Sequence, residues 1–217
     1  MYYLIGDIHG CIDHLDNLYS KIKNLISDND TLIFLGDYID RGPDSYEVIE
    51  YLISLSKENN TIFLKGNHED MLLKYKSSSL DYQNYMENGG MATIKSYKKN
   101  LGSFTIPLNH QVFFNNLTQY FESEDFIAVH AGLNPKIYNI EAQSSYDMLW
   151  IRDKFFRDPR KWEKTIIFGH TPCSILSGQN KEIYFNKDTN IIGIDTGACY
   201  GGVLTCLRWP DKSIYQE

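Results

Sequence analysis

The sequence has little of what marks secreted, membrane-spanning or disordered proteins. It holds four cysteines, none in a C-x-x-C pair, so a disulfide framework is not expected. Its first residues are not a signal peptide, and its apolar runs are too short to span a membrane. Only six prolines occur, and no low-complexity linker divides the chain. These absences predict a soluble, cytoplasmic protein with no membrane partner.

Positive charge is also scarce. Lys and Arg number 21 against 28 Asp and Glu, which gives a net charge of −7. The overall field therefore does not attract nucleic acid, and any phosphate must bind at a local cationic site. The chain has 217 residues, of which 42% are hydrophobic, enough for one sizeable core. We expect a single domain over residues 1–217.

Strand-like and helix-like patterns alternate in the first third of the chain. Apolar residues between 12 and 26 and between 48 and 55 recur at helical spacing, whereas the segments around them are short apolar runs. Such a β-α-β-α-β order predicts a parallel sheet, and residues 69–117 read as mostly helical. The predicted fold is α/β, with two mixed sheets packed as a sandwich flanked by helices. Strands are predicted at 2–5, 31–35, 61–64, 126–129 and 165–168, and antiparallel strands at 191–194, 203–207 and 213–215.

Metal-type ligands follow five of the predicted strands. In each case an apolar run ends, a small residue often follows, and a polar side chain comes at the carboxyl end of the strand. Binding sites of open α/β sheets form beyond these ends, so the five segments are expected to converge. They are G-D-I-H-G at 6–10, G-D-Y-I-D-R-G at 36–42, G-N-H-E at 66–69, H-A-G at 130–132 and G-H at 169–170.

This polar set mixes oxygen and nitrogen donors and contains no cysteine. Such donors suit manganese, iron or zinc rather than calcium. Six ligands exceed the needs of one ion with an open position, and a bridging carboxylate would use them well. Two ions roughly 3.5–4 Å apart form a known clamp for in-line displacement at phosphorus. The candidate ligands are Asp7, His9, Asp37, Asn67, His130 and His170.

Together the five blocks resemble the signature of the calcineurin-like metallophosphoesterases. The segment I-D-T-G-A-C-Y-G-G at 194–202 is similar to the bacterial and phage branch, which includes lambda phosphatase. The resemblance spans nearly the whole chain. It implies the αββα fold of that family and two divalent metal ions, manganese first, with iron or zinc as alternatives.

The resemblance also implies roles for single residues. Asp7 and His9 would bind the first ion, and Asp37 would bridge the two ions. The second ion would be bound by Asn67, His130 and His170. A hydroxide that bridges the two ions would be the nucleophile.

Four further residues receive roles from the same resemblance. Arg41 and Arg152 would bind the substrate phosphate, although the segment around Arg152 is short and a surface ion pair is the alternative there. His68 would protonate the leaving group, oriented by Asp40.

The expected activity is hydrolysis of phosphate monoesters, with a serine/threonine phosphoprotein phosphatase as the leading interpretation and phosphotyrosine as a further substrate. This choice depends on Asp40 and on the form of the G-N-H-E block. The alternative is hydrolysis of dinucleoside polyphosphates such as diadenosine tetraphosphate. A phosphodiesterase or nuclease ranks third, because the net charge counts against it. A non-catalytic metal-binding scaffold ranks last, because every reactive position is intact.

The segment between the third and fourth blocks, residues 70–114, is expected to cover the site and set substrate choice. Its tyrosines, among them Tyr85 and Tyr97, are predicted to pack between helices. Lys95, Lys98 and Lys99 are predicted to form an exposed helix face, and His110 to be structural.

Overall fold

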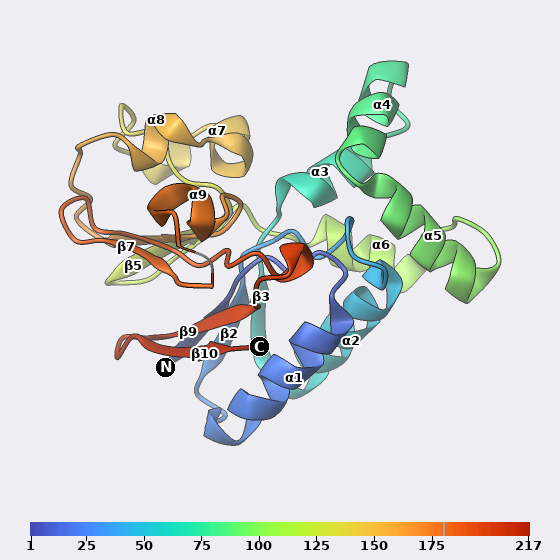
Figure 1. The fold of residues 1–217 in the computed structure, drawn as a ribbon, viewed down its shortest axis with the longest axis horizontal. Coiled ribbons are helices and arrows are strands. Elements are labelled where there is room, and N and C mark those ends of the chain that lie inside the picture. The colour runs from blue at the N-terminus through green and yellow to red at the C-terminus, as the bar shows by residue number, and fades with distance from the viewer. Residues whose placement is uncertain (180) are drawn as a thin grey trace.

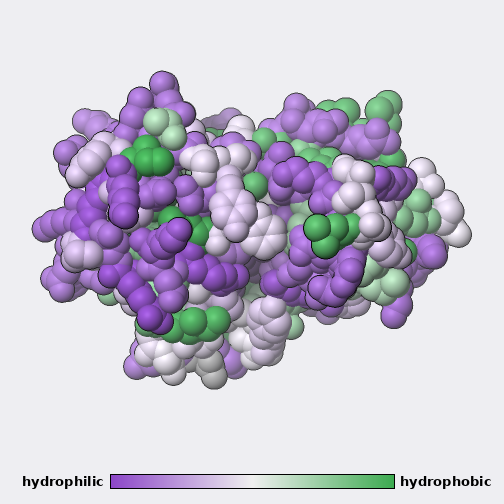
Figure 2. Space-filling model, turned by 90° about the horizontal axis from the view of Figure 1, so that it is seen from above, coloured by the Kyte–Doolittle hydropathy of each residue, from purple (hydrophilic) through white to green (hydrophobic). Residues whose placement is uncertain are grey.

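The computed structural model describes residues 1–179 and 181–217. Within these residues, two sheets of five strands each pack face to face, with helices on the outer sides (Figure 1). This confirms the predicted α/β sandwich of two mixed sheets. No helix in the described ranges is long and apolar enough to cross a membrane. On the face seen in Figure 2, hydrophobic side chains lie in small separate patches among hydrophilic ones.

The first sheet has the strand order β10-β9-β1-β2-β3. Its centre is parallel, because β1 pairs with β2 and β2 with β3 in the same direction, whereas β9 and β10 add an antiparallel edge. Each of these strands lies within two residues of its predicted position. The bounds are β1 (Tyr2–Ile5), β2 (Thr31–Phe34), β3 (Asn60–Phe63), β9 (Thr205–Trp209) and β10 (Ser213–Gln216).

The second sheet has the order β4-β5-β6-β8-β7. The prediction that residues 191–194 form an antiparallel strand is wrong for one partner, because β8 runs parallel to β6 and only β7 is antiparallel to it. The edge strands β4 and β7 were not predicted, because each is short, only partly buried and ends in a polar residue, so neither forms an apolar run. The bounds are β4 (Tyr120–Glu122), β5 (Phe126–Val129), β6 (Thr165–Phe168), β7 (Tyr184–Asn186) and β8 (Ile191–Gly193).

Helices cover both outer faces of the sandwich (Figure 1). Helices α1 (Ile12–Ile22) and α2 (Ser45–Glu58) lie on the first sheet, and α1 ends in the 3₁₀ turn Lys23–Leu25. The predicted helical middle of the chain is confirmed, and its helices α4 and α5 project to one side in Figure 1. The remaining helices are α3 (Asn67–Lys74), α4 (Ser79–Glu87), α5 (Gly90–Leu101), α6 (Leu108–Asn115), α7 (Ser145–Trp150), α8 (Asp153–Phe156) and α9 (Cys173–Ser177), with 3₁₀ turns at Ile140–Ala142 and Ala198–Tyr200.

The strand interiors are apolar on both faces because each sheet is covered on both sides. Side chains alternate along a strand, so Leu4 faces the second sheet while its neighbours Tyr3 and Ile5 face the helices. In the second sheet, Ile167 faces inward and Phe168 faces the outer helices. This explains why the strands appear in the sequence as continuous apolar runs. The two sheets are thereby fixed against each other, and their parallel strands end at one side.

Candidate metal centre and active site

Five loops bring the candidate ligands together at the carboxyl ends of β1, β2, β3, β5 and β6. The first three strands belong to one sheet and the last two to the other, so the site lies where the two sheets meet. All the candidate ligands are buried, with exposed fractions of 5% or less: Asp7, His9, Asp37, Asn67, His130 and His170. Side chains more than 100 residues apart in the sequence thus share one small volume.

The backbone at this site is held in a left-handed conformation that non-glycine residues seldom adopt. The φ angles are 48° at His9, 52° at Asp37, 70° at Asp40, 68° at Arg41 and 62° at His170. Such residues cost free energy and persist only where the surroundings fix them, commonly at functional sites. The loops therefore turn sharply to aim their side chains inward rather than relax outward.

Donor atoms converge in two overlapping groups among the described residues. One comprises His9, Asp37 and His68, and the other comprises Asp37, His130 and His170, with the donor atoms of each group within 4.8 Å of one another. Asp37 belongs to both, which is the position that a bridging carboxylate requires. Asp7 joins neither group in this structure, and its carboxylate accepts hydrogen bonds from the His170 backbone N–H at 3.2 and 3.0 Å.

Backbone carbonyls fix the orientation of two of the histidine rings. His9 donates its Nδ1 hydrogen to the Ile39 carbonyl at 2.9 Å, and His130 donates its Nδ1 hydrogen to the Leu35 carbonyl at 2.8 Å. In a neutral ring the other nitrogen, Nε2, then carries a lone pair that can bind a cation. Metal-ligating histidines are commonly oriented in this way.

The donor atoms also face one another in a way that a cation would satisfy. His130 Nε2 lies 2.9 Å from Asn67 Oδ1, and His170 Nδ1 lies 3.0 Å from the same oxygen. Nε2 of His68 and of His170 is buried without a hydrogen-bond partner among the described atoms. Buried polar atoms rarely stay unpaired in native proteins. The donor set and its lone pairs therefore fit divalent transition-metal ions.

Burial shifts the pKa values of the carboxyl groups Asp7 and Asp195 and of the histidines in opposite directions, and in both cases it favours the neutral form. Burial, together with the nearby carboxylates of Asp195 and Asp37, raises the pKa of Asp7 well above its usual value. Burial likewise raises the pKa of Asp195 to about 6. In contrast, burial lowers the pKa values of His9 and His170 and favours their neutral form. Neutral imidazoles and crowded carboxylates are both stabilised by an added positive charge.

Glu69 is a structural part of the site to which the sequence had assigned no role. Its buried carboxylate accepts hydrogen bonds from the backbone N–H groups of Asp37 at 2.9 Å, Tyr38 at 2.9 Å and Gly66 at 3.0 Å. It therefore ties the second block to the third. Burial and the nearby Asp37 carboxylate raise the pKa of Glu69 to about 8. A Cβ on Gly66 would lie 2.1 Å from Asp37 Oδ1, so only glycine permits this approach.

His68 and Asp40 form a buried pair, with His68 Nδ1 2.8 Å from Asp40 Oδ2. The other carboxylate oxygen, Oδ1, accepts hydrogen bonds from the Tyr85 hydroxyl at 2.9 Å and the Thr93 hydroxyl at 2.5 Å. Tyr85 is buried between helices as predicted, but its hydroxyl also fixes Asp40, which packing arguments did not reveal. The helices α4 and α5 thus hold the pair from one side.

The two arginines lie at the edge of the same centre. Arg41 Nη1 is 2.6 Å from His9 Nε2, and its guanidinium lies 5.3 Å from the centre of the Tyr200 ring. Arg152 donates to the Thr171 hydroxyl at 3.0 Å, next to His170 in the sequence. Because this acceptor is a neutral hydroxyl, the contact is not an ion pair. Both guanidinium groups are therefore placed beside the donor atoms, where an anion would need them.

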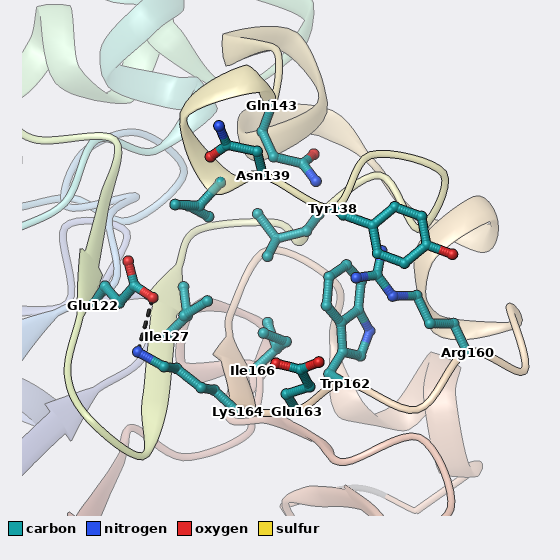
Figure 3. A pocket seen from close by; sticks show the side chains of 12 residues that line it. Glu122, Ile127, Tyr138, Asn139, Gln143, Arg160, Trp162, Glu163, Lys164 and Ile166 are labelled. Atoms are coloured by element: carbon teal, nitrogen blue, oxygen red, sulfur yellow. Dashed lines mark hydrogen bonds and ion pairs between the residues drawn. The ribbon is translucent and has the colours of Figure 1, made fainter.

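A second hollow, of about 360 Å³, lies away from this centre and is lined by none of the candidate site residues (Figure 3). There the Arg160 guanidinium lies between the rings of Tyr138 at 4.2 Å and Trp162 at 3.9 Å. Arg160 also donates to the carbonyls of Pro135 at 2.7 Å and Ile137 at 3.2 Å. It secures the loop that precedes α7, and this hollow is not the candidate active site.

Known proteins share both the blocks and the fold. The model of the calcineurin-like phosphoesterase family matches residues 2–196. The chain belongs to this family. Among solved structures, a protein assigned as a diadenosine tetraphosphatase has a TM-score of 0.70 at 22% identity, covering 100% of this chain and 92% of that one. A serine/threonine phosphatase of Saccharomyces cerevisiae has a TM-score of 0.64 at 18% identity, covering 100% and 78%. Identities this low show the fold alone.

Relatives in sequence bear on the substrate. The chain is 29% identical to the asymmetrical bis(5'-nucleosyl)-tetraphosphatase PrpE of Anoxybacillus flavithermus, over 97% of this chain and 91% of that protein. It is 26% identical to the symmetrical bis(5'-nucleosyl)-tetraphosphatase of Proteus mirabilis, over 98% and 96%. Both matches run through the whole phosphoesterase chain.

The leading expectation of a serine/threonine phosphoprotein phosphatase is therefore wrong, because relatives that match from end to end are tetraphosphatases of dinucleotides. The physical reason lies in the residues used for that choice. Asp40 holds His68, and His68 can donate a proton to any leaving oxygen. A proton donor of this kind therefore does not distinguish a phosphoprotein from a dinucleotide.

Proposed function

We propose that this phosphoesterase hydrolyses dinucleoside polyphosphates at a phosphoanhydride bond. The observation that carries the proposal is the match to bis(5'-nucleosyl)-tetraphosphatases of both the symmetrical and the asymmetrical kind along nearly the whole chain. The geometry supports it, because two overlapping donor groups and two arginines lie together at one edge of the sandwich. One such centre can bind and cleave a phosphoryl group carried by any leaving group.

The metal ligands in this proposal are the six buried side chains at the strand ends. Two divalent ions, for which we propose manganese first, would supply a water activated for attack and positive charge for the phosphate oxygens. We assign Asp37 as the bridge because it belongs to both donor groups. The remaining assignments are Asp7 and His9 on one side, and Asn67, His130 and His170 on the other.

The arginines bind the phosphate that reacts. A guanidinium presents paired N–H donors that match two phosphate oxygens. Arg41 and Arg152 approach the centre from different loops, so together they orient the phosphorus for in-line attack and stabilise the growing charge.

His68 protonates the oxygen that leaves. Its Nδ1 faces Asp40, and its Nε2 lies 3.8 Å from Asp37 Oδ2, on the side where the phosphate must lie. The Asp40 carboxylate accepts the Nδ1 hydrogen and holds the ring in one orientation. Attack of water forms a new P–O bond and breaks the anhydride P–O bond. The leaving nucleotide departs with the bridging oxygen and the proton from His68, and the attacking water gives up one proton in exchange.

We also propose that residues 1–217 form one domain. Leu4 and Ile33 of the first sheet and Ile167 of the second belong to a single buried cluster. Separate domains would not share a core of this kind.

Product analysis tests the proposed function. Purified protein with excess manganese is incubated with diadenosine tetraphosphate and, in parallel, with a phosphoserine peptide. We expect rapid cleavage of the tetraphosphate into nucleotides and slow or no release of phosphate from the peptide. ADP as the only nucleotide product identifies symmetrical cleavage, whereas ATP with AMP identifies asymmetrical cleavage. Peptide turnover without tetraphosphate turnover would refute the proposal.

A further inference from the structure

A hollow of about 630 Å³ adjoins the candidate active site on the side of α5. Arg41 lies in its wall, so the same side chain borders the metal centre and the hollow. The backbone keeps this relation fixed, because the Arg41 N–H donates to the Gly89 carbonyl at 3.3 Å, next to the first residue of α5. A molecule whose phosphate reaches Arg41 can therefore extend directly into this space.

Helix α5 presents different faces to the two regions. Its buried side chain Thr93 holds Asp40, whereas Ala92, Lys95 and Lys99, spaced along one face of the helix, line the hollow. Met91, at the start of the helix, is 45% exposed and adds an apolar surface. Helix α5 thus both supports Asp40 through Thr93 and forms one wall of the hollow.

The charge in this hollow contrasts with the chain as a whole, whose net charge is −7. Two lysines and Arg41 lie along it, although Lys99 lies 3.4 Å from both Asp44 and Glu47, which balance its charge. Lys95 is exposed and lies nearer than Lys99 to the start of the helix and to Gly89. A local cluster of positive charge in an acidic protein favours an anionic ligand.

We propose that this hollow binds the part of the substrate beyond the cleaved bond, with Lys95 contacting its further phosphates and Met91 contacting its nucleoside. A chain of phosphates that ends in a flat, largely apolar base matches a surface that has lysine next to methionine and proline. The inference rests on the proposed function for its natural ligand. It adds Lys95 as a residue that selects polyphosphates over simple phosphate esters.

The test compares Lys95→Gln with Lys98→Gln, a matched control at an exposed position of the same helix that does not line the hollow. We expect Lys95→Gln to raise the KM for diadenosine tetraphosphate about tenfold more than the KM for p-nitrophenyl phosphate, the factor for one lost charge-assisted hydrogen bond. Lys98→Gln should leave both constants unchanged. Equal KM values for the tetraphosphate in the wild type and Lys95→Gln would overturn the inference.

Inhibition keeps the inference testable if the tetraphosphate is not a substrate. Inorganic tripolyphosphate and orthophosphate compete with p-nitrophenyl phosphate in excess manganese, and in the proposed subsite the longer anion extends from Arg41 toward Lys95. Weaker inhibition by tripolyphosphate alone in Lys95→Gln supports the subsite even where the proposed function has failed. Unchanged inhibition, or an equal loss for both anions, refutes it. If tripolyphosphate inhibition is weakened in Lys181→Gln and not in Lys95→Gln, the phosphates lie in the hollow beside Tyr200, and the inference is refuted.

Discussion

Replacing Tyr85 by phenylalanine tests how the Asp40–His68 pair is held. The substitution removes one hydroxyl, which lies 2.9 Å from Asp40 Oδ1, and leaves the buried ring in place. A hydrogen bond to a charged acceptor contributes about 1.5–3 kcal/mol, so the free energy of unfolding should fall by about that amount. If about 1.4 kcal/mol of this loss appears in the transition state, the rate falls about tenfold.

The substrate dependence separates positioning from general destabilisation. Phenyl phosphate releases a phenolate whose acid has a pKa of about 10, as for tyrosine, and needs a proton. The nitro group stabilises the leaving group of p-nitrophenyl phosphate, which needs less help. We expect kcat for phenyl phosphate to fall about tenfold in Tyr85→Phe and kcat for p-nitrophenyl phosphate to fall about twofold. The measurements are steady-state kinetics on both esters and urea unfolding.

Tyr97→Phe is the matched control for this substitution. Tyr97 is also buried between helices, but its hydroxyl contacts His110 Nδ1 at 2.7 Å rather than Asp40. It should lower stability without changing the ratio of the two kcat values. If Tyr85→Phe lowers both kcat values equally, or neither, the hydroxyl does not position the pair and the reasoning is refuted.

Four further predictions concern the centre itself. Excess manganese should raise the melting temperature of the wild type, since a ligand at 100 times its Kd stabilises the folded state by about 2.7 kcal/mol. Asp37→Asn should abolish this rise, which differential scanning calorimetry measures. Gly66→Ala should weaken manganese binding in a titration, since its Cβ would lie 2.1 Å from Asp37 Oδ1. Arg152→Lys should lower kcat/KM by roughly 10- to 100-fold through loss of paired donors, whereas Arg160→Lys, at the other hollow, should not. His68→Asn should slow phenyl phosphate far more than diadenosine tetraphosphate, and equal losses would contradict its role as an acid.

Much of the fold could be predicted because its central strands are covered on both faces. Strands such as β5 (F-I-A-V) and β6 (T-I-I-F) therefore appear as short, almost continuous apolar runs, with bounds at the predicted residues. The direction of β8 could not be predicted, because a three-residue strand carries no sign of which neighbour it joins. Sequence patterns describe what each strand buries, whereas pairing depends on the path of the chain between strands.

The candidate site was predictable for a related reason. Parallel strands of one layer end at a common edge, so ligands placed just after strands must lie close together. Side chains that act on the site from a distance in sequence carried no such signal. Glu69 belongs to the G-N-H-E block, but no role could be assigned to it from the sequence, although its carboxylate accepts hydrogen bonds from the backbone N–H groups of Asp37 and Tyr38. Thr93 lies 53 residues from Asp40, and only the packing of α5 brings the two together.

The five blocks indicate the reaction but not the substrate, because the reactive side chains that they supply gather around the candidate metal centre. A serine leaving group is an alkoxide, a strong base comparable to hydroxide, and it needs the proton of His68. A nucleotide leaving group ends in a phosphate whose second pKa is about 6, so it departs near neutral pH with little assistance. The Asp40–His68 pair is therefore compatible with an anhydride, for which it is less necessary, and its presence does not favour a phosphoprotein. Discrimination must come from surfaces beyond the transferred phosphate, and beside Arg41 such a surface carries lysines on a helix that none of the five blocks includes.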